Sequence, residues 1–201
     1  MKATKIRAYL VVPALAAVLG LSTYTASADH VSPAGNTSAS SSNVTIKLGT
    51  ATVTCTSSSA GFNAQDSASG QPVCGTIGPP APTLTGCTVK ASGFTFSASC
   101  TTSGSWSLCA SSGGTSSLTI PPGGVVCTAN ILGQTCKATA SSASSPGTTI
   151  SGAWSNTSSS ATFTNQSIPT TTSGGFPCPS GTSSSFSATY ATSPALTITP
   201  N

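Results

Sequence analysis

Ionisable side chains are what this 201-residue sequence has least of: 4% of its residues are charged, two are acidic and one is histidine. Beyond residue 28, the acidic, basic and histidine residues are Lys47, Lys90, Lys137, Asp29, Asp66 and His30. Acid–base hydrolysis needs two convergent carboxylates, and we expect Asp66 to be a solvated loop residue. A Ser-His-Asp arrangement would have to use His30, close to a terminus where nothing fixes its ring. The sequence therefore predicts that the protein is not an enzyme.

The shortage of positive charge also excludes nucleic-acid-binding proteins. Half of the six basic residues lie in the first seven positions, so the formal net charge of +4 belongs mostly to that segment. The other three lysines are too few to neutralise a run of phosphates, and we expect no nucleic-acid partner. A surface of serine, threonine and asparagine with little charge repulsion is instead prone to self-association or adhesion.

Long apolar runs are also rare, and the one that occurs, Ala8–Leu21, follows a basic stretch in residues 2–7. It is shorter than the roughly 20 residues of a membrane span. Small residues at positions 26 and 28 match a signal peptidase site. The sequence therefore predicts a signal peptide over residues 1–28, cleaved after Ala28, and no membrane span in the remainder. The protein is expected to be secreted or extracellular, with cell-wall association as one form of this.

The segment after the predicted cleavage point has a weak potential for metal binding. Asp29 and His30 would offer a terminal amine and an imidazole to a copper ion. We favour a disordered tail, because residues 29–43 are rich in serine, alanine and glycine and are expected to form a flexible N-terminal lead-in. No cofactor and no metal site are predicted. Residues 44–201 are expected to form a single all-β domain.

Cysteine, by contrast, is plentiful. The eight cysteines all follow the apolar run, at Cys55, Cys74, Cys87, Cys100, Cys109, Cys127, Cys136 and Cys178. They lack the paired CxxC spacing and the neighbouring histidines of metal sites. An even number in an exported chain predicts up to four disulfides, each stabilising the fold by about 2–4 kcal/mol. The count by itself leaves the pairing open.

Apolar and polar residues alternate in many short segments after residue 43, which is the period of a half-buried strand. No segment there shows a helical period. About ten short strands separated by glycine and proline turns predict an all-β fold, an antiparallel β-sandwich or barrel stapled by disulfides and without helices. Residues 57–82 show little periodicity and are predicted to be a long loop with one short strand at Val73–Ile77.

The parity of the alternation predicts particular hairpins. Val44–Leu48 pairs with Ala51–Cys55 across a turn at Gly49-Thr50, unless the two form one strand with a bulge at Gly49. The segment Phe94–Ala110 is predicted to be a hairpin with Cys100 opposite Trp106 and with Gly104 in the left-handed backbone region.

Further hairpins follow along the chain. Pro121–Gly124 is predicted to be a turn that sets Ile120 against Val125. A turn at Gly133-Gln134 is predicted to set Ile131 against Cys136. Near the C-terminus, Trp154 is expected to face Ala161, and Phe163 to cover the gap at Gly152.

The same parity restricts the disulfides. Cys100 and Cys109 point to opposite sides of the predicted hairpin. Cys127 and Cys136 share a face but lie four residues out of the predicted register, roughly 14 Å apart, which is beyond the reach of a disulfide. We expect neither pair to be bonded.

The aromatic residues suggest a stacking platform for sugars, formed by Trp106, Trp154, Tyr190 and the phenylalanines. Both tryptophans fall on strand faces that also carry leucine, isoleucine and alanine. Core packing is therefore the preferred interpretation.

The pattern resembles a group of uncharacterised secreted proteins from actinobacteria, of similar length. The matching segments are Val31–Gly35, Thr52–Cys55, Gly104–Leu108 and Ser193–Pro200. The resemblance implies an extracellular β-sandwich with Cys55–Cys87 and Cys136–Cys178 disulfides, and leaves the partners of the other four cysteines open. It brings no known activity with it.

Together these features predict a secreted, non-catalytic β-domain that acts in adhesion or assembly. Its partners are unknown; cell-wall material and further copies of the chain are the candidates that the uncharged surface suggests. The alternative is a carrier or binding module that holds a small apolar ligand or glycan in an aromatic-lined cleft.

Overall fold

The computed structural model describes residues 28–68, 70–141 and 147–201, so the predicted signal peptide lies outside the described residues except for Ala28. The described chain consists of strands joined by turns and loops. The strands are β1 (Asp29–Ser32), β2 (Gly35–Ser41), β3 (Val44–Leu48), β4 (Ala51–Ala64), β5 (Val73–Ile77), β6 (Thr83–Ala91), β7 (Phe94–Thr102), β8 (Trp106–Ala110), β9 (Thr115–Ile120), β10 (Val125–Ile131), β11 (Gln134–Ala140), β12 (Thr148–Ser155), β13 (Ser160–Ser173), β14 (Ser183–Ser193) and β15 (Thr197–Pro200). No helix of a length and apolarity that would cross a membrane occurs in these ranges.

Hydrogen-bonded strand pairing closes on itself twice. Ring A follows the order β3-β4-β6-β7-β10-β11-β13-β14 and returns from β14 to β3. Ring B follows β2-β4-β5-β8-β9-β12-β13-β14 and returns from β14 to β2. The pairings in both rings are antiparallel. The predicted all-β, antiparallel, helix-free fold class is confirmed for the described residues, and the closed pairing gives it a barrel-like form.

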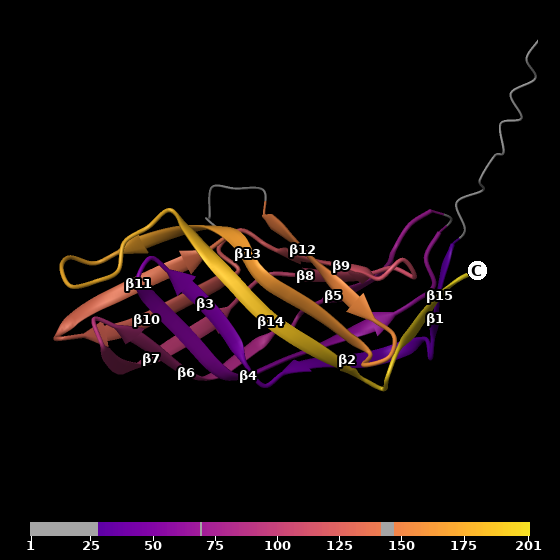
Figure 1. Cartoon of the computed structure of the whole chain (residues 1–201), viewed down its shortest axis with the longest axis horizontal. Coiled ribbons are helices and arrows are strands. Elements are labelled where there is room, and N and C mark those ends of the chain that lie inside the picture. The colour runs from indigo at the N-terminus through magenta and orange to yellow at the C-terminus, as the bar shows by residue number, and fades with distance from the viewer. Residues whose placement is uncertain (1–27, 69, 142–146) are drawn as a thin grey trace, which may run out of the picture.

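Three long strands, β4, β13 and β14, belong to both rings and run along the elongated body (Figure 1). Strand β14 pairs with β3 through Ser185–Ala188 and then with β2 through Ala191–Ser193. The rings therefore lie end to end, with ring A on the left of Figure 1 and ring B on the right. Strands β1 and β15 form a separate pair beyond ring B.

The core is formed by alternate residues of these strands. In β14, Phe186, Ala188 and Tyr190 are buried, whereas the residues between them are exposed or half-buried. Phe163 of β13 packs against Phe186 with ring centroids 6.3 Å apart. A fully buried aromatic side chain of this size typically stabilises a fold by about 3 kcal/mol. The two-residue period read from the sequence thus identifies the buried face correctly.

Several predicted local pairings are confirmed. Leu48 lies opposite Ala51 and Val44 opposite Cys55, so the hairpin at Gly49 is present and the bulge alternative is excluded. Trp154 lies opposite Ala161. A Cβ added to Gly152 would lie 2.8 Å from Phe163 Cδ1, which shows that the phenyl ring fills this gap.

The predicted hairpin of Phe94–Ala110 is wrong. Strand β7 pairs with β6 and β10 in ring A, whereas β8 pairs with β5 and β9 in ring B. The β6–β7 turn contains Ser92 and Gly93, both with positive φ, which suits the right-handed twist of a two-residue hairpin. Gly104 adopts φ +76° as predicted, but it lies in a connection between the two rings.

The pairing of Ile120 with Val125 is also wrong, for the same reason: β9 belongs to ring B and β10 to ring A. The Pro121–Gly124 turn does form, since the Gly124 amide donates to the Pro121 carbonyl at 2.9 Å. In the β10–β11 hairpin, Cys136 lies opposite Ala129 rather than Ile131. The register moves by two residues because the turn is at Leu132-Gly133, where Leu132 itself adopts positive φ.

The extent of strand was underestimated. Residues 29–43, expected to be a flexible lead-in, form β1 and β2. Much of the predicted 57–82 loop belongs to β4, which continues to Ala64 and pairs with β2 through serine and other small residues. The short strand Val73–Ile77 is confirmed. Serine-rich strands lack the apolar alternation on which the sequence prediction depended.

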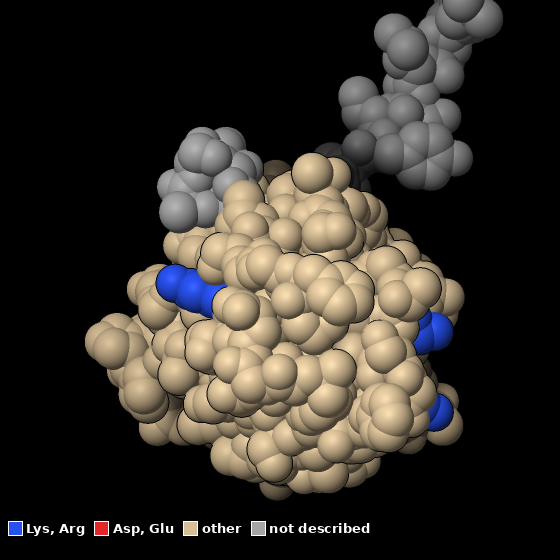
Figure 2. All heavy atoms as spheres, turned by 90° about the vertical axis from the view of Figure 1, so that its left-hand side faces the viewer, with Lys and Arg blue, Asp and Glu red and all other residues tan. Residues whose placement is uncertain are grey.

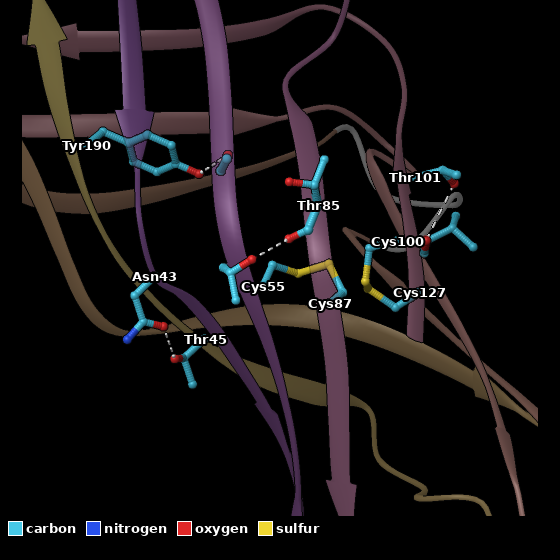
Figure 3. The surroundings of a disulfide bond; sticks show 12 residues. Asn43, Thr45, Cys55, Thr85, Cys87, Cys100, Thr101, Cys127 and Tyr190 are labelled. Carbon is cyan, nitrogen blue, oxygen red and sulfur yellow. Dashed lines mark hydrogen bonds between the residues drawn. A yellow bond between two sulfur atoms is a disulfide. The ribbon is translucent and has the colours of Figure 1, made fainter. Parts of the chain in front are cut away.

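Four disulfides connect the strands: Cys55–Cys87, Cys74–Cys109, Cys100–Cys127 and Cys136–Cys178. Both pairs implied by the family resemblance are present, and both pairs excluded by parity are absent. The first three disulfides each join residues directly opposite one another on neighbouring strands. Figure 3 shows the Cys55–Cys87 and Cys100–Cys127 bonds side by side.

Candidate functional site

Four connections of ring A meet at one end of the body. They are the turns at residues 49–50, 92–93 and 132–133 and the loop of residues 174–182. The antiparallel register requires this, since Lys90 lies opposite Thr52 and Lys137 lies opposite Ser173. We call this surface the lysine end.

The lysine end carries the exposed large apolar side chains of the described chain. Phe94, Leu132 and Phe176 are 63%, 67% and 98% exposed, and no other large apolar side chain within the described ranges is classed as exposed. Each is on a different connection or directly beside it. Single exposed apolar side chains are common on proteins, but a group of them on one end makes that end the candidate for an interaction surface.

The basic residues of the described chain lie on the same end. Lys47, Lys90 and Lys137 are exposed; the first two lie two residues from the turns of their hairpins and Lys137 lies four residues from its turn. Figure 2, which looks at this end, shows basic side chains around the edge and no acidic side chain in view. Two strand residues span roughly 7 Å. The lysines therefore form a band set back from the apolar tips.

The loop of residues 174–182 is fixed across the end of ring A. The Cys136–Cys178 disulfide ties it to β11. On the other side it touches the β3–β4 hairpin, because a Cβ added to Gly181 would lie 2.8 Å from Leu48 Cδ1. Phe176 is thus presented to solvent by a cross-linked loop.

An apolar cavity of about 50 Å³ lies inside ring A, beneath this loop. Its lining comes from all eight strands of the ring and includes Ile46, Val89, Ala129 and Pro179. Alanines at several inward positions leave the space. No aromatic side chain of the described residues lines this cavity. A smaller apolar cavity of about 20 Å³ in ring B is lined in part by aromatic side chains, those of Trp106 and Tyr190.

The opposite end of the body holds both aspartates. His30 Nδ1 lies 2.9 Å from an Asp66 carboxylate oxygen, which also accepts a hydrogen bond of 2.9 Å from the Val31 amide. The amide of Asp29 donates to Ser67 Oγ at 2.8 Å, and its buried carboxylate accepts from the Ser112 amide at 3.1 Å. The expected disordered tail is therefore wrong, since residues 29–32 form strand β1. Asp66 is an exposed loop residue, as predicted, but its carboxylate and that of Asp29 both hold β1 in place.

The Val31 amide and the adjacent His30 ring hold the pKa of Asp66 below its usual value, and Asp66 stays ionised at neutral pH. His30 and Asp66 have side chains about half exposed, at 50% and 54%. Among the described residues, no hydroxyl or thiol hydrogen-bonds to the His30 ring. Ser67 Oγ instead contacts the backbone of Asp29. Two members of a hydrolytic triad are thus together, without an attached nucleophile.

Of the aromatic residues considered for sugar stacking, both tryptophans and Tyr190 lie in the core, whereas Phe94 and Phe176 are exposed. Trp106 and Trp154 are buried, and their indole N–H groups donate to the Ser103 carbonyl and to Asn156 Oδ1. Tyr190 is hydrogen-bonded to the fully buried Ser58 at 3.0 Å, and burial raises the pKa of its phenol. The preference for core packing is confirmed.

The sulfur atoms of Cys55, Cys87 and Cys100 lie within 4.8 Å of one another, the spacing of a metal site. All three belong to disulfides (Figure 3), and a metal requires thiolates. The cluster therefore acts as a double cross-link through β4, β6, β7 and β10.

Sequence reasoning missed the lysine end altogether. Its local signals were glycines beside large apolar residues, at Gly93-Phe94, Leu132-Gly133 and Gly175-Phe176. From the sequence alone, such a residue cannot be distinguished from the first or last buried residue of a strand.

In comparisons with known proteins, no family model, no curated protein and no solved structure matches this chain. The resemblance to actinobacterial secreted proteins accordingly stays a prediction.

Proposed function

We propose that this is a secreted, non-catalytic β-domain that acts outside the cell by adhesion or assembly, and that the lysine end is its contact surface. The observation that carries the proposal is the gathering of Phe94, Leu132 and Phe176 on one end of the molecule. Four disulfides are compatible with an extracellular location.

The test is a pull-down of the purified chain, lacking residues 1–28, with the cell envelope of its own source. A variant with serine in place of all three apolar residues should lose envelope binding. Because these side chains are exposed, each substitution should change the free energy of unfolding by no more than about 0.5 kcal/mol. Assembly is tested on the same pair by light scattering at rising concentration. Equal envelope binding and equal scattering by parent and variant would refute the assignment of this surface.

A carrier for a small apolar ligand is the second candidate, supported by the cavity in ring A. Ligand sites usually enclose about 300–1,000 Å³, against about 50 Å³ here. A ligand would therefore have to displace the loop of residues 174–182. A thermal-shift screen against short alkanes, fatty acids and glycans distinguishes this function from adhesion.

Hydrolysis is the third candidate, and the His30–Asp66 contact is the observation that favours it. An exposed imidazole–carboxylate contact with no bound hydroxyl offers a candidate general base but no positioned nucleophile. Ester hydrolysis that His30→Ala abolishes would establish an enzyme and overturn the proposal of a non-catalytic protein.

A further inference from the structure

We propose that the lysine end docks on an anionic lipid bilayer, with Phe94, Leu132 and Phe176 entering the interface and Lys47, Lys90 and Lys137 contacting the headgroups. This inference rests on the proposed function, since it names the partner of the same surface. Its basis is that the exposed apolar side chains lie at the tips of the turns and the basic side chains lie behind them on the same end.

The shape of the surface favours a bilayer over a folded protein partner. The apolar side chains stand on separate turns rather than in one continuous flat face. A protein interface needs about 800 Å² of complementary surface on each partner, whereas a fluid interface accepts isolated projecting side chains. Lysines set back from the tips can keep their ammonium groups at headgroup level while the tips are immersed.

The charge distribution gives the docking its direction. The three lysines lie at one end, and Asp29 and Asp66 are held at the other by hydrogen bonds. An anionic surface therefore attracts the lysine end and repels the opposite end. Each lysine near such a surface contributes about fivefold to affinity.

The backbone at Leu132 is an independent observation that points to the same surface. Leu132 adopts φ +52° in a two-residue turn, where asparagine or glycine is preferred. Its side chain is largely in water, so neither packing nor solubility accounts for a leucine there. A strained, exposed apolar residue at a turn is the feature expected of a binding tip.

The first experiment measures co-sedimentation of the chain lacking residues 1–28 with vesicles. Vesicles of phosphatidylcholine mixed with phosphatidylglycerol should bind the protein, and vesicles of phosphatidylcholine alone should bind it at least tenfold more weakly. Replacing Lys47, Lys90 or Lys137 by glutamine should weaken binding about fivefold each. Asp66→Asn raises the net charge at the far end and should leave affinity unchanged. A gain in affinity on Asp66→Asn as large as the loss on removing one lysine would show a response to total charge only and would overturn the proposal.

The second experiment separates insertion from folding. Leu132→Asn should preserve or raise the unfolding temperature, because asparagine tolerates this backbone, while weakening vesicle binding about tenfold. Phe176→Trp should show a blue-shifted emission on vesicle addition and quenching by brominated lipid. Thr76→Trp, at an exposed position of β5 in ring B, is the matched control and should show neither effect.

The vesicle experiments and the envelope experiment can refute the two proposals independently of each other. If the parent binds its envelope through the lysine end but does not bind anionic vesicles, the lipid assignment is wrong and adhesion stands. If Phe176→Trp responds no more than Thr76→Trp, docking through this end is wrong even where vesicles bind. If the parent binds neither, both proposals fall.

Discussion

Removing the Cys136–Cys178 disulfide by a double change to alanine tests how the tip loop is held. The bond closes 42 residues of chain, and no other cysteine lies between its ends. The other three disulfides overlap, since Cys74 lies within the Cys55–Cys87 loop and Cys100 within the Cys74–Cys109 loop. Cys136–Cys178 is thus the one whose loss leaves the remaining cross-links undisturbed.

The loop-closure entropy of this length corresponds to about 4 kcal/mol of unfolding free energy. For a domain of this size that loss lowers the unfolding temperature by roughly 8–16 °C. The urea m-value should rise, because the denatured chain is free to expand. Residues 174–182 should also become a preferred site of proteolysis, since nothing else cross-links that loop to β11.

Urea denaturation followed by fluorescence of the buried tryptophans measures the loss. Phe176→Ala is the matched control, because it alters the same loop at a residue 98% exposed and should change stability by less than about 0.5 kcal/mol. A loss below about 1 kcal/mol for the double variant, with an unchanged m-value, would refute the reasoning and show that the loop is ordered without the bond.

Three further predictions concern the core and the pH dependence. Phe163→Ala should cost about 3–5 kcal/mol in urea denaturation, because its ring is almost fully buried and fills the space at Gly152; a cost below about 1 kcal/mol would contradict that packing. The folded-state pKa of Asp66 lies below 3.8, so the stability that its ionised carboxylate contributes is present above that pH and is lost as the pH falls through the folded pKa. Asp66→Asn should therefore reduce the fall in unfolding temperature at acid pH. An unchanged fall would argue against the contacts with Val31 and His30. The pKa of Tyr190 is raised above 10.0, so the stability of the fold should decline as the pH rises beyond 10. Tyr190→Phe should remove that decline, and it should cost about 1–3 kcal/mol of stability at neutral pH because the Ser58 hydroxyl loses its partner. A decline at alkaline pH identical to the parent's would point to another group.

Two-residue periodicity predicted the strand faces well because it depends only on local backbone geometry. It gave the hairpin at Gly49 as one of two alternatives and predicted the contact of Trp154 with Ala161, where short connections leave the chain little choice of partner. The same rule failed between β7 and β8, since a strand has two edges and parity does not say which neighbour occupies either of them. The two disulfide exclusions were correct in outcome but not in their reasons. The Cys127–Cys136 exclusion used a wrong register, since Cys127 lies two residues rather than four from the position opposite Cys136. The Cys100–Cys109 exclusion used a hairpin that does not form.

The functional surface was beyond the reach of sequence reasoning for a related reason. Phe94, Leu132 and Phe176 are far apart in the chain, and each reads locally as a residue at a strand or loop boundary. Only closure of ring A brings their connections to one end. The His30–Asp66 contact was likewise invisible, because it depends on β1 pairing with β15 from the other end of the chain.

By itself, the sequence determined that the chain is all-β, cross-linked by cystines and almost without ionisable groups, since composition and a local period decide those properties. The tertiary structure decided which strands are neighbours, which cysteines meet, and that apolar tips and lysines share one end while the aspartates share the other. The physical reason is that strand pairing between distant segments is selected by the closure of the whole sheet, and no window of the sequence contains that information.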